Sequence, residues 1–334
     1  MGWKDLFKSK SLTIPKADPR LRWFGKLPTY GDYYTSALPG DWAPQFNDWI
    51  LKGYEQYMVR SQELGTKPAR LPRSLFVLRM PKGDNTVIGL FDDYGGDNRG
   101  RPFPICFYVA TPTVHLPGPT SATLGVIKPV FDDLLALERD ISHFFRVPGR
   151  FDSVFGGREL RMPEFLTAEP DTSWKEAAGD LSMGDWLARA SGKLADPTER
   201  WFERVRQFGR GIVEYAREQE DFEPTLRFPL VSDISPVTQA CAWLRWLERR
   251  MPLDERYISI FLPVGTTDPA ARLTVVARAP VPEDFQLLAD RLDPPAYVDD
   301  LSKLMPRGNG DAATNSSDSS VEGPSGSWLE FVER

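Results

Sequence analysis

Three aspartates lie close together in a glycine-rich loop of this 334-residue chain. The segment FDDYGGDNRGRPFP contains Asp92, Asp93 and Asp97 directly after an apolar run. Carboxylate oxygens bind hard divalent cations, so this spacing suits a metal-dependent phosphatase or hydrolase. An EF-hand pattern is absent, however, and loops rich in Asp and Gly are common turns between strands. We therefore keep a metal-dependent enzyme as the alternative interpretation, and we predict no metal and no cofactor.

Other enzyme signatures are missing from the sequence. It contains no GxxxxGK[ST], GxSxG, HExxH or GxGxxG motif. Its two histidines, His115 and His143, have no nucleophile motif nearby, so we interpret both as structural residues. The sequence thus predicts no catalytic residues and favours a protein that is not an enzyme.

Two loops are rich in residues with special backbone or side-chain properties. In the first, GKLPTYGDYY at 25–34, Pro28 fixes its own φ and Gly31 can take a positive φ. Asp32 then accepts backbone N–H groups and sets a sharp turn. We expect the tyrosines Tyr30, Tyr33 and Tyr34 to lie on the surface of this turn.

The second loop, DNRGRPFP at 97–104, places Arg99 and Arg101 before an apolar run. A planar guanidinium can bind a carboxylate through two parallel hydrogen bonds. We therefore expect an arginine of this loop to pair with Asp32 or Asp97 and so to bring the two loops together.

These loops supply the residues that we predict to contact a protein partner. Tyrosines beside a rigid loop suit protein recognition, although they suit a cover over the core equally well. The predicted contact residues are Lys26, Tyr30, Asp32, Tyr33, Arg99 and Arg101. The predicted structural residues are Gly25, Pro28, Gly31, Trp49, Asp97, Gly100 and Pro104.

The elements that position the loops follow from the spacing of apolar residues. Runs rich in β-branched and aromatic residues predict strands at 21–27, 74–80, 85–91 and 102–110. The short link between the strands at 74–80 and 85–91 favours an antiparallel meander. Apolar spacings of three and four predict one helix from about Asp41 and another at about 124–145.

The second half of the chain repeats a similar order of elements. We predict helices from Asp196 and from Pro236, the latter capped by Ser235, then a hairpin of strands at 257–264 and 272–279 and a last helix at 282–292. The predicted divisions are a polar leader at 1–20, an N-terminal domain at 21–146, an irregular connection at 147–195, a helix and strand lobe at 196–300 and a disordered tail at 301–334.

The tail ends in an apolar peptide, WLEFVER. Trp328, Leu329 and Phe331 follow a segment of Gly, Ser, Asn, Asp and Ala, which is typical of a disordered linker. Such a peptide could dock on a partner or in a groove of its own lobe, and the opposing interpretation is an end without a role.

Composition limits the classes of partner. The chain has 41 Lys and Arg against 47 Asp and Glu, a formal charge of −6, so no overall field attracts it to nucleic acid or anionic lipid. No apolar run reaches the length of a signal peptide or a membrane span. Cys106 and Cys241 sit in apolar runs without a CxxC spacing. We therefore expect a cytoplasmic protein with reduced thiols.

The loop motifs resemble those of the TagF/ImpM family of type VI secretion-associated proteins. That family opens with a GKLPxxGDF segment, and this chain has Tyr33 where the phenylalanine usually stands. The matching residues are Gly25, Lys26, Leu27, Pro28, Gly31 and Asp32. A later family element, D-x-x-GR-x-[FY]-P, resembles Asp97, Gly100, Arg101, Phe103 and Pro104. The resemblance covers about residues 21–145.

This resemblance implies both a fold and a role. The implied fold is α+β, an antiparallel sheet flanked by helices and similar to longin-type domains, to which this chain adds a second α/β lobe and the tail. The implied role is that of an accessory regulator of a type VI secretion system. Such a protein acts after translation to hold secretion in check, and its implied partner is a forkhead-associated scaffold protein. No catalytic residues are implied.

Overall fold

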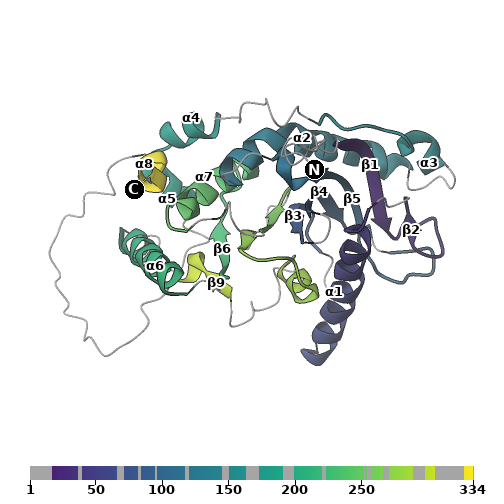
Figure 1. Ribbon diagram of the computed structural model, residues 1–334, viewed down its shortest axis with the longest axis horizontal. Helices are drawn as coiled ribbons and strands as arrows, with labels where there is room; N and C mark the ends of the chain where they lie inside the picture. The colour runs from purple at the N-terminus through teal and green to yellow at the C-terminus, as the bar shows by residue number, and fades with distance from the viewer. Residues whose placement is uncertain are drawn as a thin grey trace, which may run out of the picture.

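A single nine-stranded sheet forms the centre of the protein in the computed structural model (Figure 1). The residues that the structure describes are 17–36, 40–65, 71–81, 84–94, 96–116, 120–144, 150–162, 173–190, 199–219, 223–251, 253, 258–265, 271–288, 298–304 and 327–333. The strand order is β2-β1-β5-β4-β3-β7-β8-β6-β9, and all neighbours are antiparallel except β6 and β9. The predicted α+β class with a largely antiparallel sheet is confirmed.

The strands of the first half are β1 (Asp18–Gly25), β2 (Tyr34–Thr35), β3 (Ser74–Met80), β4 (Asn85–Asp92) and β5 (Ile105–Pro112). Those of the second half are β6 (Thr225–Pro229), β7 (Ser259–Pro263), β8 (Arg272–Val276) and β9 (Val298–Asp300). The halves join where β3 pairs with β7, with Leu75 opposite Leu262 and Val77 opposite Ile260. Both predicted lobes therefore share one sheet.

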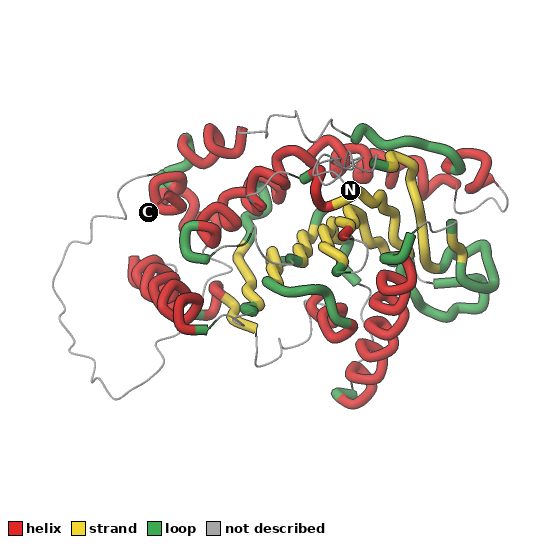
Figure 2. Tube along the Cα trace, viewed as in Figure 1, coloured by secondary structure: helices red, strands yellow, loops and turns green. Residues whose placement is uncertain are grey.

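Helices cover both faces of this sheet (Figure 2). The α-helices are α1 (Ala43–Glu63), α2 (Thr120–Phe144), α3 (Arg150–Phe155), α4 (Ser173–Gly179), α5 (Met183–Ala190), α6 (Glu199–Glu218), α7 (Pro236–Glu248) and α8 (Trp328–Glu333). The 3-10 helices are η3 (Thr113–His115), η5 (Pro282–Leu288) and η6 (Leu301–Lys303). On one face, Phe76 and Leu78 pack in the core that α1 and η5 complete, whereas Leu75 and Val77 face the core formed with α2 and α7.

The central strands are apolar at nearly every position because both faces are covered. All seven residues of β3 are buried, and seven of the eight residues of β4 are buried. Strands buried on both sides read as continuous apolar runs, so the sequence located them well. The predicted hairpin of β7 and β8 and the Ser235 cap of α7 are also confirmed, since Ser235 Oγ accepts from the Thr238 N–H at 3.5 Å.

Helix α1 presents the apolar face that its spacing predicts. Phe46, Trp49 and Ile50 are buried, and Pro44 stands in its first turn, where a proline costs no hydrogen bond. Trp49 donates its indole N–H to the Val281 carbonyl at 2.8 Å and stacks on Phe261 at 5.9 Å. This tryptophan therefore ties the first half of the chain to the second.

The predicted irregular connection at 147–195 is wrong in part, because three short helices lie within it. Their scattered aromatic residues are the inward faces of these helices: Phe151 of α3, Trp174 of α4 and Trp186 of α5 are all buried. Each helix has only six to eight residues, too few for a periodic pattern to stand out. The predicted helix at 282–292 is the shorter 3-10 helix η5, fixed by Asp284, which accepts from the Val281 N–H at 3.0 Å.

The predicted disordered tail also needs correction at both ends. Leu301 of η6 is fully buried, and its carbonyl accepts from the Trp201 indole at 2.8 Å. Trp328 of α8 is fully buried and stacks on Trp186 at 5.8 Å, while Phe331 lies 4.9 Å from Phe202. Aromatic burial of this size outweighs the entropy of ordering one helical turn. The peptide thus packs on its own chain, and the linker at 305–326 lies outside the described residues.

The remaining predictions concern the cysteines, the histidines, the N-terminal leader and membrane spans. Cys106 and Cys241 are buried free thiols, as predicted. His115 is buried beside the Thr111 hydroxyl, 3.3 Å away, which fits its structural role, whereas the side chain of His143 lies outside what the structure describes. The predicted leader at 1–20 ends early because β1 begins at Asp18, and residues 1–16 lie outside the described part. Across the described residues, no helix is long and apolar enough to cross a bilayer.

Candidate protein-interaction site

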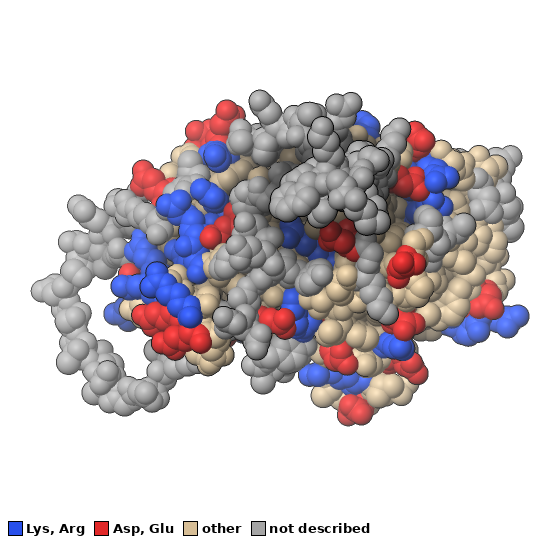
Figure 3. Space-filling view, viewed as in Figure 1, with Lys and Arg blue, Asp and Glu red and all other residues tan. Residues whose placement is uncertain are grey.

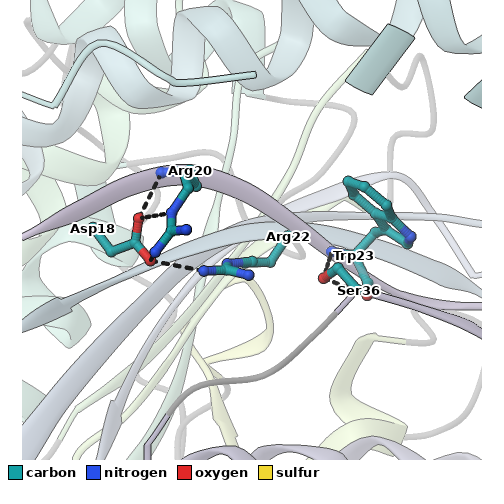
Figure 4. Close-up of polar contacts among 5 residues, drawn as sticks. All are labelled: Asp18, Arg20, Arg22, Trp23 and Ser36. Carbon is teal, nitrogen blue, oxygen red and sulfur yellow. Dashed lines mark hydrogen bonds and ion pairs between the residues drawn. The ribbon is translucent and has the colours of Figure 1, made fainter. Parts of the chain in front are cut away.

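The first predicted loop, 26–33, projects between the paired strands β1 and β2. Phe24 lies opposite Thr35, and Gly25 lies opposite Tyr34. Ser36 closes the base: its hydroxyl accepts from the Trp23 N–H at 3.0 Å, and its own N–H donates to the Trp23 carbonyl at 3.0 Å (Figure 4). The loop is therefore held at both ends by the edge of the sheet.

Gly25 is required where this loop leaves β1. A Cβ at this position would lie 2.2 Å from the Pro104 carbonyl oxygen and 2.5 Å from the Ile105 Cα, both backbone atoms of the neighbouring chain segment. Its φ of +147° is also a conformation that L-residues rarely adopt. Only glycine lets the first loop and the second loop leave the sheet this close together.

Asp97 is the centre of the second loop. Its side chain is completely buried, and Oδ1 accepts from the backbone N–H groups of Arg99 and Arg101, each at 3.0 Å. Oδ2 accepts from Arg101 Nε at 2.7 Å. Burial by itself raises the pKa of Asp97, but these hydrogen bonds and the charge of Lys26 outweigh it and lower the pKa to about 2.

Lys26 brings the first loop onto this carboxylate. Its ammonium lies 3.5 Å from Asp97 Oδ2 and 5.0 Å from the centre of the Tyr33 ring. Lys26 is only 6% exposed. Its charge is used within the site, between a carboxylate and an aromatic face, so Lys26 supports the junction from inside, and its contact with a partner stays a prediction.

Backbone contacts complete the junction of the two loops. The Asn98 N–H donates to the Tyr30 carbonyl at 3.0 Å, and Arg101 Nη2 donates to the Gly31 carbonyl. The two loops therefore meet as expected, but the predicted pair of arginine and carboxylate, Arg101 with Asp97, lies within the second loop and does not form the junction. Asp32 takes no part in it and accepts the Tyr33 N–H at 2.8 Å.

The glycines of the two loops have different tasks. Gly100 has a φ of +74° and open space where a Cβ would stand, so the turn itself demands glycine there. Gly31 has no positive φ, so the conformational freedom of this glycine is not used in the turn. Gly96, which the sequence reasoning missed, is the tightest position: a Cβ would lie 2.1 Å from the Arg101 carbonyl oxygen. The sequence feature that could have identified Gly96 is the high number of glycines in this loop.

Three predicted contact residues form the outer face of the joined loops. Tyr33 is 43% exposed while its ring stacks on Phe24 and meets the edge of Phe103 at 4.9 Å. Asp32 and Arg99 are also exposed. We call Asp32, Tyr33 and Arg99 the loop face. It offers a carboxylate, a phenol ring and a guanidinium on a backbone that buried contacts hold in place.

Tyr30 has a more structural position than predicted. It is half-buried and stacks on Tyr34 at 4.4 Å, and Tyr34 in turn stacks on Trp23 at 5.9 Å. Pro28 is exposed beside it, whereas Pro104 is buried at the start of β5. Tyr30 therefore matches the expected cover over the core, whereas protein recognition by the exposed Tyr33 stays a prediction.

The aspartates of the alternative metal site are turned to different partners. Asp92 accepts from Arg73 Nε at 2.8 Å, and Asp93 accepts from the Leu71 N–H at 3.3 Å. Asp97 is occupied by Arg101 and Lys26, as described above. Among the described residues, no group of three His, Cys, Asp or Glu side chains is arranged to hold a metal ion.

The predicted tail site lies far from the loop face. Trp328 and Phe331 are buried against aromatic rings of α5, α6 and α7. The side chain of Leu329 lies outside the described part. In Figure 1, α8 stands at the opposite end of the molecule from β1 and β2. The tail peptide and the loops therefore form separate sites.

Comparison with known proteins adds one finding. No family model matches the chain, and no curated protein matches it either. Among solved structures it is similar to the crystal structure of PA0076 from Pseudomonas aeruginosa PAO1, at 13% sequence identity and a TM-score of 0.43. The match covers 87% of this chain and 100% of the other. At this level of similarity the family resemblance of the loops stays a prediction.

Proposed function

We propose that this protein is an accessory regulator of a bacterial type VI secretion system, acting in the cytoplasm after translation. In this proposal it binds and sequesters a forkhead-associated scaffold protein through the loop face. The observation that supports it is the set of hydrogen bonds and ion pairs that the two loops direct at the buried Asp97. The motif residues that resemble the TagF/ImpM family converge there, and they hold Asp32, Tyr33 and Arg99 outward.

The chemistry of the loop face suits recognition of a protein. Tyr33 packs on Phe24 and Phe103, so its ring offers apolar area and loses little side-chain conformational entropy on binding. The neighbouring Arg99 adds directed hydrogen bonds. Among the described residues, the Arg99 guanidinium has no carboxylate within ion-pair distance. Its donors are available to an acceptor on the partner.

A calorimetric titration with the purified scaffold protein tests this proposal. Tyr33→Ala and Arg99→Glu are each expected to weaken binding at least tenfold, as for residues at the centre of an interface. Tyr215→Ala and Arg217→Glu are the matched controls. They make the same two substitutions at exposed positions of α6, away from the loop face. Equal affinity of all four variants would move the interface off the loop face. Failure of the native protein to bind would exclude the scaffold as partner.

The alternative, a metal-dependent hydrolase, has its own test. A cation that binds only the native state raises the melting temperature by mass action. Because Asp92 and Asp97 already face arginine or lysine, we expect no upward shift with Mg²⁺, Mn²⁺ or Ca²⁺. A shift that Asp92→Asn abolishes would restore the enzyme interpretation.

A further inference from the structure

A second arginine-rich region lies between α6 and the end of α7. A hollow of about 680 Å³ opens there, and Arg206 and Arg210 line it from α6. Arg249 and Arg250, which directly follow α7, line its other side. Figure 3 shows basic side chains gathered over this end of the molecule. We call these four residues and Glu203 the arginine hollow.

Arg250 is fixed in position within the hollow. Its guanidinium lies 4.0 Å from the centre of the Trp246 ring, and Nη1 donates to the Trp246 carbonyl. It also passes so near α6 that a Cβ on Gly209 would lie 2.3 Å from its Nε. Gly209 therefore makes room for this arginine, and the aromatic stack orients it before any ligand arrives.

Positive charge exceeds negative charge in the hollow. Glu203 is the one acidic residue among its lining residues, and it is shared by Arg210 at 3.0 Å and Arg206 at 3.6 Å. Within the described residues, no carboxylate forms an ion pair with Arg250. Its pKa is lowered to about 10, first by burial and then by the neighbouring charge of Arg249, so it remains charged at neutral pH. The described lining residues thus include four arginines and one glutamate.

We propose that the arginine hollow binds a small ligand carrying two or more phosphate groups, held by Arg250, Arg206 and Arg210. Guanidinium groups bind phosphate oxygens through paired hydrogen bonds, and a polyanion matches several arginines at once. The hollow is wider than a single phosphate needs. Val213 is its one sizeable apolar lining residue, so charge supplies the recognition.

This inference is independent of the proposed secretion role. The hollow lies on α6 and α7, whereas the loop face lies at the β1 and β2 edge, at the other end of the view in Figure 1. Its test needs no partner protein. Failure of the loop face to bind a scaffold would therefore leave the arginine hollow untouched.

Inorganic pyrophosphate titrated into the full-length protein is the probe. We expect it to bind more tightly than orthophosphate or sulfate, and to bind less tightly at high salt because these side chains are screened. Arg210→Gln and Arg206→Gln should each weaken binding about tenfold. Both side chains are exposed, so folding is retained. Arg250→Gln should abolish binding, with circular dichroism to confirm its fold.

Two further variants sharpen the test. Arg217→Gln removes an equal charge from the same helix outside the hollow, so its affinity should equal that of the native protein. Glu203→Gln removes the acid that competes for Arg206 and Arg210, and it should strengthen binding by roughly two- to fivefold.

Four outcomes overturn the proposal. They are no binding of pyrophosphate, equal binding of pyrophosphate and sulfate, equal loss in Arg217→Gln and Arg210→Gln, and binding only to vesicles that contain phosphatidylglycerol. The last result would assign the hollow to a membrane surface.

Discussion

The loop site and the arginine hollow both contain several arginines but use them differently. In the loops, Arg101 forms an ion pair with Asp97, a fully buried carboxylate that also forms an ion pair with Lys26. In the hollow, Arg250 faces the Trp246 ring, and the one acid among the described lining residues is the half-exposed Glu203. A cation matched by a buried acid fixes the backbone around it, whereas a cation without such a partner is free to bind a ligand.

Replacing the buried acid is the strongest way to break this comparison. Asp97→Asn keeps the shape of the side chain but leaves Lys26 and Arg101 facing a neutral amide. We expect it to lower the urea midpoint of unfolding more than any other loop substitution, because a buried charge then lacks its counter-ion. Asp32→Asn, at an exposed position, is the control and should leave the midpoint unchanged. Equal midpoints for both variants would contradict a structural role for Asp97.

Closing the space at Gly25 has the next largest effect. Gly25→Ala places a methyl group against the Pro104 backbone and should lower the free energy of unfolding by about 1–3 kcal/mol. Gly211→Ala on α6 meets nothing within 4 Å and should raise it by about 0.5–1 kcal/mol, since alanine favours a helix. Chemical denaturation measures both, and a neutral Gly25→Ala would show that the loops can move apart freely.

The stability of the protein should depend on acid pH through the carboxylates that are hydrogen-bonded to arginines. Asp18 accepts hydrogen bonds from the guanidinium groups of Arg20 and Arg22 (Figure 4). In both Asp18 and Asp97, burial by itself raises the pKa, but hydrogen bonds outweigh it and lower the pKa from 3.8 to about 2 in the folded protein. The unfolded chain therefore binds more protons between these values, and the stability they contribute is present above about pH 4 and lost as pH falls toward 2. Unfolding midpoints at pH 7, 5, 4 and 3 should show this decline. A slope that is the same in Asp97→Asn would exclude Asp97 as a contributor.

The smallest effect on stability is expected at an arginine without an acid. Arg99→Ala removes an exposed guanidinium and should change the free energy of unfolding by less than about 0.5 kcal/mol. Thermal melting of this variant beside Arg101→Ala sharpens the contrast, since Arg101 loses its bond to Asp97 and should melt lower. A larger loss in Arg99→Ala would mean that the loop face is structural after all.

The elements that were predicted well are those whose apolar pattern is visible within their own residues. Strand β3 is apolar because both its faces are covered, and α1 shows its buried side at spacings of three and four. The pairing of Arg101 with Asp97 was also predictable, because the two residues are four positions apart in the second loop. The contact that joins the loops through this carboxylate, that of Lys26, was not predicted.

What the sequence could not show depends on distant partners. The pairing of β3 with β7 joins residues about 185 positions apart, and the short strands β6 and β9 gain their order from neighbours. The burial of Lys26 follows from the charge of Asp97 across the loop junction, which no local pattern records. The docking of α8 likewise depends on a groove made by Trp186 and Phe202.

Hydrogen exchange of the protein, alone and saturated with the scaffold protein, tests the central claim most directly. The proposal predicts slower exchange in peptides covering 26–35 and 96–104, the two loops that carry Asp32, Tyr33 and Arg99, with unchanged exchange in α6. Protection confined to α6, α7 or α1, with both loops exchanging as in the free protein, would contradict it.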